Sequence, residues 1–247
     1  NVAIGTNAMT NASGVNTDGN VVIGYNAGDA FGANNVYGTV LIGRQAGSSI
    51  NNGDAAGTIA IGYNAGVAIT GGQYNTVVGY QAGNVITTGG KNTLFGYQAG
   101  GGGTGIDTLS DNTFMGYHAG LKIDSGARNT AIGSQALTDI TSGAGNTAVG
   151  REAGANITTG GDNVAIGKLA LYTATSPSQN VAVGNEALRL TNTGGANVGV
   201  GRESGYSGTT HSGSVYIGEQ AGYSVTTGNE NIAIGHNAIN GGTVTGD

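Results

Sequence analysis

NTAVGREAGANITTGGD, residues 146–162, is one of a series of similar phrases that run through the whole chain. Its opening returns as NTAIGSQAL at 129–137 and as NTVVGYQAG at 75–83, and its ITTGG ending returns at 86–90. Catalysis needs unlike groups that converge on one point, whereas a repeated phrase places like groups in rows. The repetition therefore predicts a structural protein and not an enzyme.

Repeats that begin at this Asn-Thr/Val phrase account for all 247 residues in fourteen copies, most of them 17 residues long. They begin at residues 1, 20, 39, 58, 75, 92, 112, 129, 146, 163, 180, 197, 214 and 231. With the first residue of each repeat called position 1, position 5 is glycine in all fourteen repeats and position 8 is alanine in thirteen. Position 4 is Ile or Val in twelve.

A repeat of this length has room for two short strands and two turns, and none for a helix with a strand. The T/V-A-I segment has the β-branched, alternating composition of a strand, and the TTGG ending supplies glycines for a tight corner. One such coil cannot bury its apolar side chains alone, but stacked coils can. The sequence predicts an all-β fold, a parallel β-solenoid of fourteen coils, as a single repetitive domain over 1–247 that is a fragment of a longer fibre.

The longer repeats fit this layout. The first three carry two extra residues after position 12, and the sixth carries three between Gly100 and Ile106. Insertions at corners project outward without disturbing the strand pairing.

The predicted strand carries apolar residues on both of its faces, because side chains alternate along a strand. Position 4 is bulky and aliphatic, so positions 2 and 4 are expected to fill the coil interior, with Ile132, Val149 and Ile166 in one inner column. Position 3 is then expected to face outward as an apolar stripe, a feature typical of an interface between copies of a chain. We predict that this interface centres on Val77, Leu94 and Phe114; the alternative is that small outward alanines are merely tolerated.

The NVAIG phrase at 163–167, with variants at 1, 129 and 231, resembles the head domains of trimeric autotransporter adhesins. The longer NTAIG…TTGG phrase is also similar to repeats of phage and prophage tail fibres. The resemblance covers the whole chain and implies a left-handed β-roll that forms a homotrimer on a cell surface or a virion. The chain departs from the adhesin heads in its longer repeat and in showing no stalk, neck or anchor.

Composition excludes several other classes. The 51 glycines follow no Gly-X-Y period, no apolar run is long enough to cross a bilayer, and the 8 Lys and Arg residues are scattered in a chain of net charge −6. We therefore expect neither nucleic-acid binding nor membrane insertion. The chain has no cysteine, which suits an extracellular protein that does not depend on disulfides.

Residues that carry chemistry do not converge in the repeat pattern. The histidines His118, His211 and His236 lie in separate repeats and are expected at the surface, so no metal site is predicted. Glu152, Glu186 and Glu203 recur at position 7, where a paired-carboxylate glycosidase site is one hypothesis and surface ion pairs with Arg151 and Arg202 are the favoured one. Gly100, Gly102 and Gly105 match a dinucleotide-binding fingerprint without its helix, so we expect a loop, no enzyme and no cofactor.

Two rows of side chains do suggest a role. Amides recur at position 7, where they are expected to hydrogen-bond from coil to coil. Tyrosines recur at position 6, where they either stabilise the sheet or form a surface- or glycan-binding track. That candidate track consists of Tyr25, Tyr63, Tyr80, Tyr97 and Tyr117.

The predicted function is that of a structural or adhesive extracellular fibre segment, from a phage tail fibre or a bacterial surface adhesin. Its expected partners are further copies of the chain, as a homotrimer, and a cell-surface glycan or host receptor. Two alternatives remain open: a subunit of a self-assembling extracellular filament, and a solenoid that binds or degrades polysaccharide.

Overall fold

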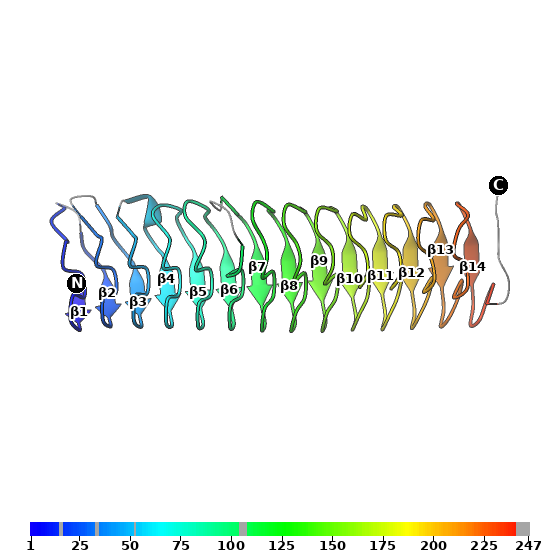
Figure 1. Cartoon of the computed structure of the whole chain (residues 1–247), viewed down its shortest axis with the longest axis horizontal. Coiled ribbons are helices and arrows are strands. Elements are labelled where there is room, and N and C mark those ends of the chain that lie inside the picture. The colour runs from blue at the N-terminus through cyan, green and yellow to red at the C-terminus, as the bar shows by residue number, and fades with distance from the viewer. Residues whose placement is uncertain (15–16, 33–34, 52, 104–107, 241–247) are drawn as a thin grey trace. The chain divides into compact units, whose positions relative to one another are not determined.

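The computed structural model describes residues 1–14, 17–32, 35–51, 53–103 and 108–240. The chain divides into two compact units, an N-terminal unit of residues 1–127 and a C-terminal unit of residues 128–247. Each unit is a parallel β-solenoid with one strand per repeat (Figure 1). The predicted fold class is confirmed.

The strands of the two units occupy the same positions of the repeat, positions 2 to 4. The N-terminal unit holds β1 (Val2–Ile4), β2 (Val21–Ile23), β3 (Val40–Ile42), β4 (Ile59–Ile61), β5 (Thr76–Val78), β6 (Thr93–Phe95), β7 (Thr113–Met115) and one short 3-10 helix, η1 (Gly53–Ala55). The C-terminal unit holds β8 (Thr130–Ile132), β9 (Thr147–Val149), β10 (Val164–Ile166), β11 (Val181–Val183), β12 (Val198–Val200), β13 (Val215–Ile217) and β14 (Ile232–Ile234).

Within each unit, neighbouring strands pair in parallel with equal repeat positions side by side. Leu94 of β6 pairs with Val77 of β5 and with Phe114 of β7, and Ala148 of β9 pairs with Ala131 of β8. Outside the strands the backbone still bonds from coil to coil, as where the Gln81 N–H donates to the Tyr63 carbonyl at 2.8 Å. The rows of like residues expected from the repeat are therefore present.

Each coil contains one three-residue strand in its described part, so the prediction of two strands per coil is wrong. The reason lies in the backbone angles, because the strand ends at the position-5 glycine and left-handed residues follow it. Gly79 has a φ of 137°, and a Cβ there would lie 2.2 Å from the Gly96 carbonyl oxygen. Position 7 is left-handed too, even where it is not glycine, as in Gln81 with a φ of 51°. These angles turn the chain through successive corners instead of a second strand.

The two faces of the strand are exchanged relative to the sequence prediction. Val77, Leu94 and Phe114, predicted at an interface between chains, have 0% exposed surface and lie inside their own coil. Ile132 and Ile166, predicted inside, are 38% and 40% exposed. Ile132, Val149 and Ile166 pair in register in one column, as predicted, but the column faces outward.

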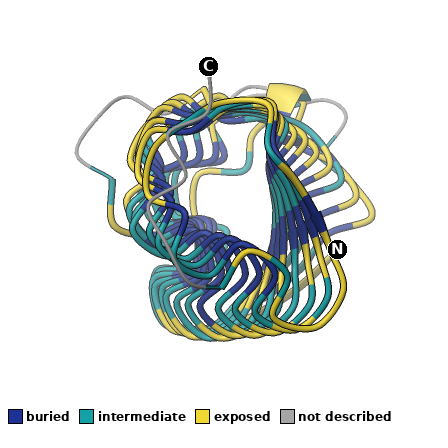
Figure 2. Cartoon of the chain, turned by 90° about the vertical axis from the view of Figure 1, so that its right-hand side faces the viewer, coloured by how far each residue is buried: buried dark blue, intermediate teal, exposed yellow. Residues whose placement is uncertain are grey.

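The physical reason for this exchange is that the interior is narrow. Besides position 3 it is filled by the alanines of position 8 and the larger residues of position 12, such as Ile69 and Ile86, all fully buried. In Figure 2 the buried residues recur at the same places in successive coils. Because the position-12 side chain already occupies the interior, only one side chain of the strand fits there in each coil. That side chain is the one at position 3.

Position 3 is matched in size to position 9. Repeats with a bulky position 3 have glycine six residues later, as in the pairs Leu41/Gly47, Phe114/Gly120 and Tyr216/Gly222. A Cβ at Gly120 would lie 2.4 Å from Cε2 of Phe114, so the glycine makes space for the ring. In three repeats with alanine at position 3, position 9 holds a buried leucine, as in the pair Ala131/Leu137, whereas Ala60 and Ala148 keep glycine at position 9.

A row of buried asparagines at position 1 joins the coils along each unit. The side-chain oxygen of Asn75 accepts the backbone N–H of Asn92 at 3.0 Å and its side-chain amide at 3.0 Å. The same Asn92 amide donates to the carbonyl of Leu109 at 2.8 Å. These bonds satisfy buried polar groups at the entrance to the strands that follow a buried asparagine, whereas position 1 is Thr39, Thr58 or Ser214 in three other repeats. This buried row at position 1 is additional to the amide row predicted at position 7.

Candidate functional site: aromatic rows and charged pairs

The predicted tyrosine track is a stacked ladder in the N-terminal unit. Ring centroids are 5.1 Å apart between Tyr63 and Tyr80, 5.1 Å between Tyr80 and Tyr97, and 5.4 Å between Tyr97 and Tyr117. The first two pairs have interplanar angles of 9° and 6°, so the rings are almost parallel.

Tyr25 joins this ladder through an arginine. The guanidinium of Arg44, at position 6 of the third repeat, lies 5.8 Å from the Tyr25 ring centroid and 5.4 Å from that of Tyr63. Because a cation above a ring face attracts the ring's electrons, Arg44 continues the stack between the two tyrosines. The sequence-based track omitted this residue, although its repeat position shows that it belongs to the row.

The stacking determines which part of each tyrosine a ligand can reach. Each inner ring has its two faces against its neighbours, so edges and hydroxyl groups are left to solvent. A sugar that stacks on an aromatic ring needs a free ring face. The inner rings of the ladder therefore cannot act as stacking platforms, and the ladder stabilises the packing of successive coils.

A second ladder lies in the C-terminal unit at position 10. The Arg189 guanidinium lies 5.7 Å from the Tyr172 ring centroid and 5.5 Å from that of Tyr206, and Tyr206 stacks on Tyr223 at 4.9 Å. This row was not predicted from the sequence. A signal was present, since the four residues occupy one position in four successive repeats.

The position-7 row behaves as predicted at several places. The Gln98 side-chain amide donates to the Gln81 side-chain oxygen at 2.9 Å, and a ring nitrogen of His118 lies 2.9 Å from the Gln98 oxygen. The carboxylates that replace amides in this row form ion pairs. Arg151 lies 3.2 Å from Glu152 and Arg202 lies 2.7 Å from Glu203, which confirms the predicted pairs.

Two of the three histidines depart from the predicted surface position. His118 is partly buried and its ring stacks on Tyr117 with centroids 3.8 Å apart. His211 has 0% exposed surface, and neither of its ring nitrogens has a hydrogen-bond partner among the described residues. Burial lowers the pKa of His211 below its usual value. The surface placement was wrong for His211 because position 12 of its repeat is glycine, Gly208, and a side chain there would occupy the space that the His211 ring fills.

The outward face of the strands is apolar. Phe95 and Met115 of the N-terminal unit and Ile132, Ile166, Val200 and Ile217 of the C-terminal unit are all more than a third exposed. We call these position-4 residues the outer apolar face. Parallel sheets are normally covered on both faces, so a bare apolar face on a parallel sheet is unusual in a finished assembly.

Other kinds of site are not formed by the described residues. No group of three or more His, Asp or Glu side chains there could hold a metal ion. No helix in this part of the chain is long and apolar enough to span a membrane. Gly105 of the glycine fingerprint lies outside the described residues, with the neighbouring part of the sixth-repeat insertion. Residues 15–16, 33–34 and 52, in the longer corners of the first three repeats, also lie outside them.

The fold defines the class of protein as a parallel β-solenoid built from a 17-residue repeat. Comparisons of the chain with protein-family models, with curated proteins and with solved structures find no match.

Proposed function

We propose that this chain is a structural and adhesive segment of an extracellular fibre, from a phage tail fibre or a bacterial surface adhesin, that associates with copies of itself. The outer apolar face is the observation that supports the proposal. It carries one apolar side chain per coil, and in the single chain each of these side chains is partly or largely exposed to solvent.

A second copy of the chain is the partner that suits this face best. The face repeats with the same spacing as the coils, so a partner with the same repeat meets each outward side chain with an equivalent one. The resemblance to adhesin heads and tail fibres implies that three copies associate. The proposed interface is therefore at position 4 and not at position 3, which is buried within the chain.

The filament alternative rests on different residues. Within the described part of the chain, β1 and β14 each pair with a single strand, and both carry exposed apolar side chains at position 2, Val2 and Ile232. An open strand edge invites further pairing. A filament grows without limit as concentration rises, whereas association through the outer face gives a closed oligomer of fixed mass.

A polysaccharide-degrading solenoid is less well supported. Such an enzyme needs one carboxylic acid with a raised pKa beside a second carboxylate. Glu152 and Glu203 are instead held in ion pairs with arginines.

Light scattering on the purified chain tests the proposal. Phe95→Asp is expected to shift the wild-type oligomer towards monomer and to raise its dissociation constant more than about a hundredfold, because an unpaired carboxylate is buried at the interface. Tyr37→Asp is the matched control, since Tyr37 is an equally exposed aromatic residue outside the strands, and it is expected to leave the mass unchanged.

Two outcomes contradict the proposal. A monomeric wild-type chain removes self-association altogether. An oligomer that Phe95→Asp leaves intact places the contact on another surface.

A further inference from the structure

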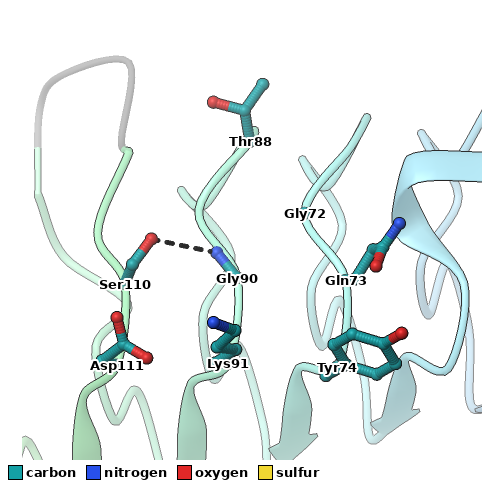
Figure 3. A pocket seen from close by; sticks show the side chains of 8 residues that line it. All are labelled: Gly72, Gln73, Tyr74, Thr88, Gly90, Lys91, Ser110 and Asp111. Atoms are coloured by element: carbon teal, nitrogen blue, oxygen red, sulfur yellow. Dashed lines mark hydrogen bonds between the residues drawn. The ribbon is translucent and has the colours of Figure 1, made fainter.

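A pocket of about 220 Å³ opens at a corner of the N-terminal unit, where three successive coils approach β5, β6 and β7. Its lower row consists of Tyr74, Lys91 and Asp111, each of which directly precedes position 1 of its repeat (Figure 3). All three have left-handed backbone angles, with φ of 63°, 60° and 61°. Because they share this conformation, the three unlike side chains lie side by side at the same corner of three successive coils.

The pocket lies at a corner column of the repeat whose residue type varies along the chain. The same place in the first three repeats is held by glycine, at Gly19, Gly38 and Gly57. A tyrosine, a lysine and an aspartate then follow in consecutive repeats. Because the rest of the coil keeps its pattern here, a change in this one column alters the surface without altering the fold.

Tyr74 differs from the tyrosines of the ladder. It is 61% exposed, and no other aromatic ring stacks on it among the described residues. A Cβ at Gly57 would lie 3.1 Å from Cδ1 of Tyr74, so the absence of a side chain at Gly57 lets the ring lie against the preceding coil. Tyr74 is therefore supported by the backbone and keeps ring surface free for a ligand.

The polar groups around Tyr74 are available for a ligand. Within the described part of the chain, no hydrogen bond or ion pair occupies the side chains of Gln73, Lys91 or Asp111. The backbone beneath them is already satisfied, since the Lys91 N–H donates to the Gln73 carbonyl at 2.9 Å and the Gly90 N–H donates to the Ser110 hydroxyl at 3.2 Å. The pocket thus offers free donors and free acceptors on a fixed frame.

This combination selects the chemistry of the ligand. A phosphate or a carboxylate would be repelled by the negative charge of Asp111, and a cation would be repelled by the positive charge of Lys91. A ligand with a single charge therefore has one unfavourable neighbour. A pyranose ring has an apolar C–H face that packs on tyrosine, and hydroxyl groups that both donate and accept hydrogen bonds. A neutral sugar therefore suits the tyrosine ring and the unpaired polar side chains of Gln73, Lys91 and Asp111 without a like charge beside it.

We infer that the pocket of Tyr74, Lys91 and Asp111 binds one neutral pyranose residue of a glycan, with its apolar face on Tyr74 and its hydroxyl groups on Lys91, Asp111 and Gln73. This inference rests on the proposed attachment function and assigns the chemistry of the surface to which the fibre attaches. The site is distinct from the tyrosine ladder, whose inner ring faces are covered.

Saturation-transfer NMR on the full chain tests the inference with methyl glycosides of neutral hexoses and N-acetylhexosamines as probes. At least one probe is expected to bind, and Tyr74→Ala and Asp111→Asn are each expected to weaken that binding about tenfold or more. Asp162→Asn is the matched control, because Asp162 has the same repeat position and a φ of 57° but belongs to a coil in the other unit. It is expected to leave binding unchanged.

The inference is overturned if no neutral glycoside binds, if Tyr74→Ala binds as well as the wild type, or if inorganic phosphate or methyl glucuronide binds more tightly than every neutral glycoside. Light scattering on the same samples separates this result from the fibre proposal. An oligomer that binds no sugar contradicts the pocket alone, and a monomer that binds sugar contradicts self-association alone.

Discussion

Leu94 and Phe95 are neighbours in β6, yet Leu94 is fully buried inside the coil and Phe95 is 52% exposed on the outer apolar face. The same division holds along both units, with position 3 inward and position 4 outward. If the inward position of the strand is assigned one residue too far along, the buried core and the outer apolar face are exchanged. The two residues therefore give opposite responses to the same substitution.

The first prediction is that Leu94→Asp unfolds the N-terminal unit, whereas Phe95→Asp leaves the chain folded. A carboxylate at position 94 has no partner inside the coil, and its burial is expected to cost more than about 3 kcal/mol of unfolding free energy. Phe95→Asp places the carboxylate in water and is expected to change the stability of the single chain by less than about 1 kcal/mol. Urea unfolding followed by circular dichroism, at a concentration where the chain is monomeric, measures both.

The second prediction concerns the matched sizes of positions 3 and 9. Gly120→Leu alone forces a side chain into the Phe114 ring, and Phe114→Ala alone leaves a cavity; each is expected to destabilise the chain by about 2–5 kcal/mol. The double variant reproduces the arrangement of Ala131 with Leu137. Leu137 shows that leucine accepts this conformation, since its φ is 47°.

A double-mutant cycle in urea measures the coupling between the two sites. The two changes together are expected to cost at least about 2 kcal/mol less than the sum of the single changes. Additive costs contradict the packing relation between Phe114 and Gly120.

The sequence predicted the fold because the repeat length, the β-branched strand and the corner glycines all point to the same architecture. It did not predict which face is inward, because positions 3 and 4 are both apolar and alternation alone does not rank them. The size match between Phe114 and Gly120 contains that information. It is recognised only when position 9 is known to be close to position 3, which depends on the left-handed corner between them.

The candidate site was predicted in part for a similar reason. Equal repeat positions lie side by side, so the row from Tyr63 to Tyr117 follows directly from the sequence. The orientation of the rings does not, and it decides that the ladder faces are covered. The pocket at Tyr74 was missed because its residues lie in the corner column, where the sequence varies and no repeated phrase marks them.

The third prediction is that Asn146→Ala destabilises the C-terminal unit by about 2–4 kcal/mol. The Asn146 side-chain oxygen accepts the Asn163 backbone N–H at 3.2 Å and its side-chain amide at 2.9 Å, and the Asn146 amide donates to the Gly160 carbonyl at 2.9 Å. Alanine removes these bonds from the Asn163 N–H and the Gly160 carbonyl, whereas the Asn163 side-chain amide keeps its bonds to the carbonyls of Gly161 and Pro177. Thermal unfolding of the variant measures the loss.

Asn146→Ser is the control for this prediction. Ser214 occupies position 1 naturally, and its hydroxyl accepts the Asn231 N–H at 3.1 Å. A serine at 146 is expected to recover part of the stability through the same bond. Equal losses for alanine and serine show that the hydrogen bonds are not the cause.

The last prediction concerns pH and the buried pair of His211 and Tyr216. Their rings meet edge to face with centroids 5.4 Å apart, and both residues are fully buried. Burial lowers the pKa of His211 below the usual 6.5, while the unfolded chain keeps the usual value. As pH falls through that usual value, the unfolded state binds a proton that the folded state does not bind, so the stability present at higher pH is lost.

Unfolding free energies of wild type and His211→Leu between about pH 8 and about pH 5 test this sign, in a range where exposed carboxylates stay ionised. The wild type is expected to lose stability towards the acid end, and His211→Leu is expected to lose less. His118, whose pKa burial also lowers, stays in both proteins, so the difference between the two curves isolates His211. Parallel curves contradict a neutral, unpartnered imidazole in the interior of the coil, and with it the packing of His211 against Tyr216.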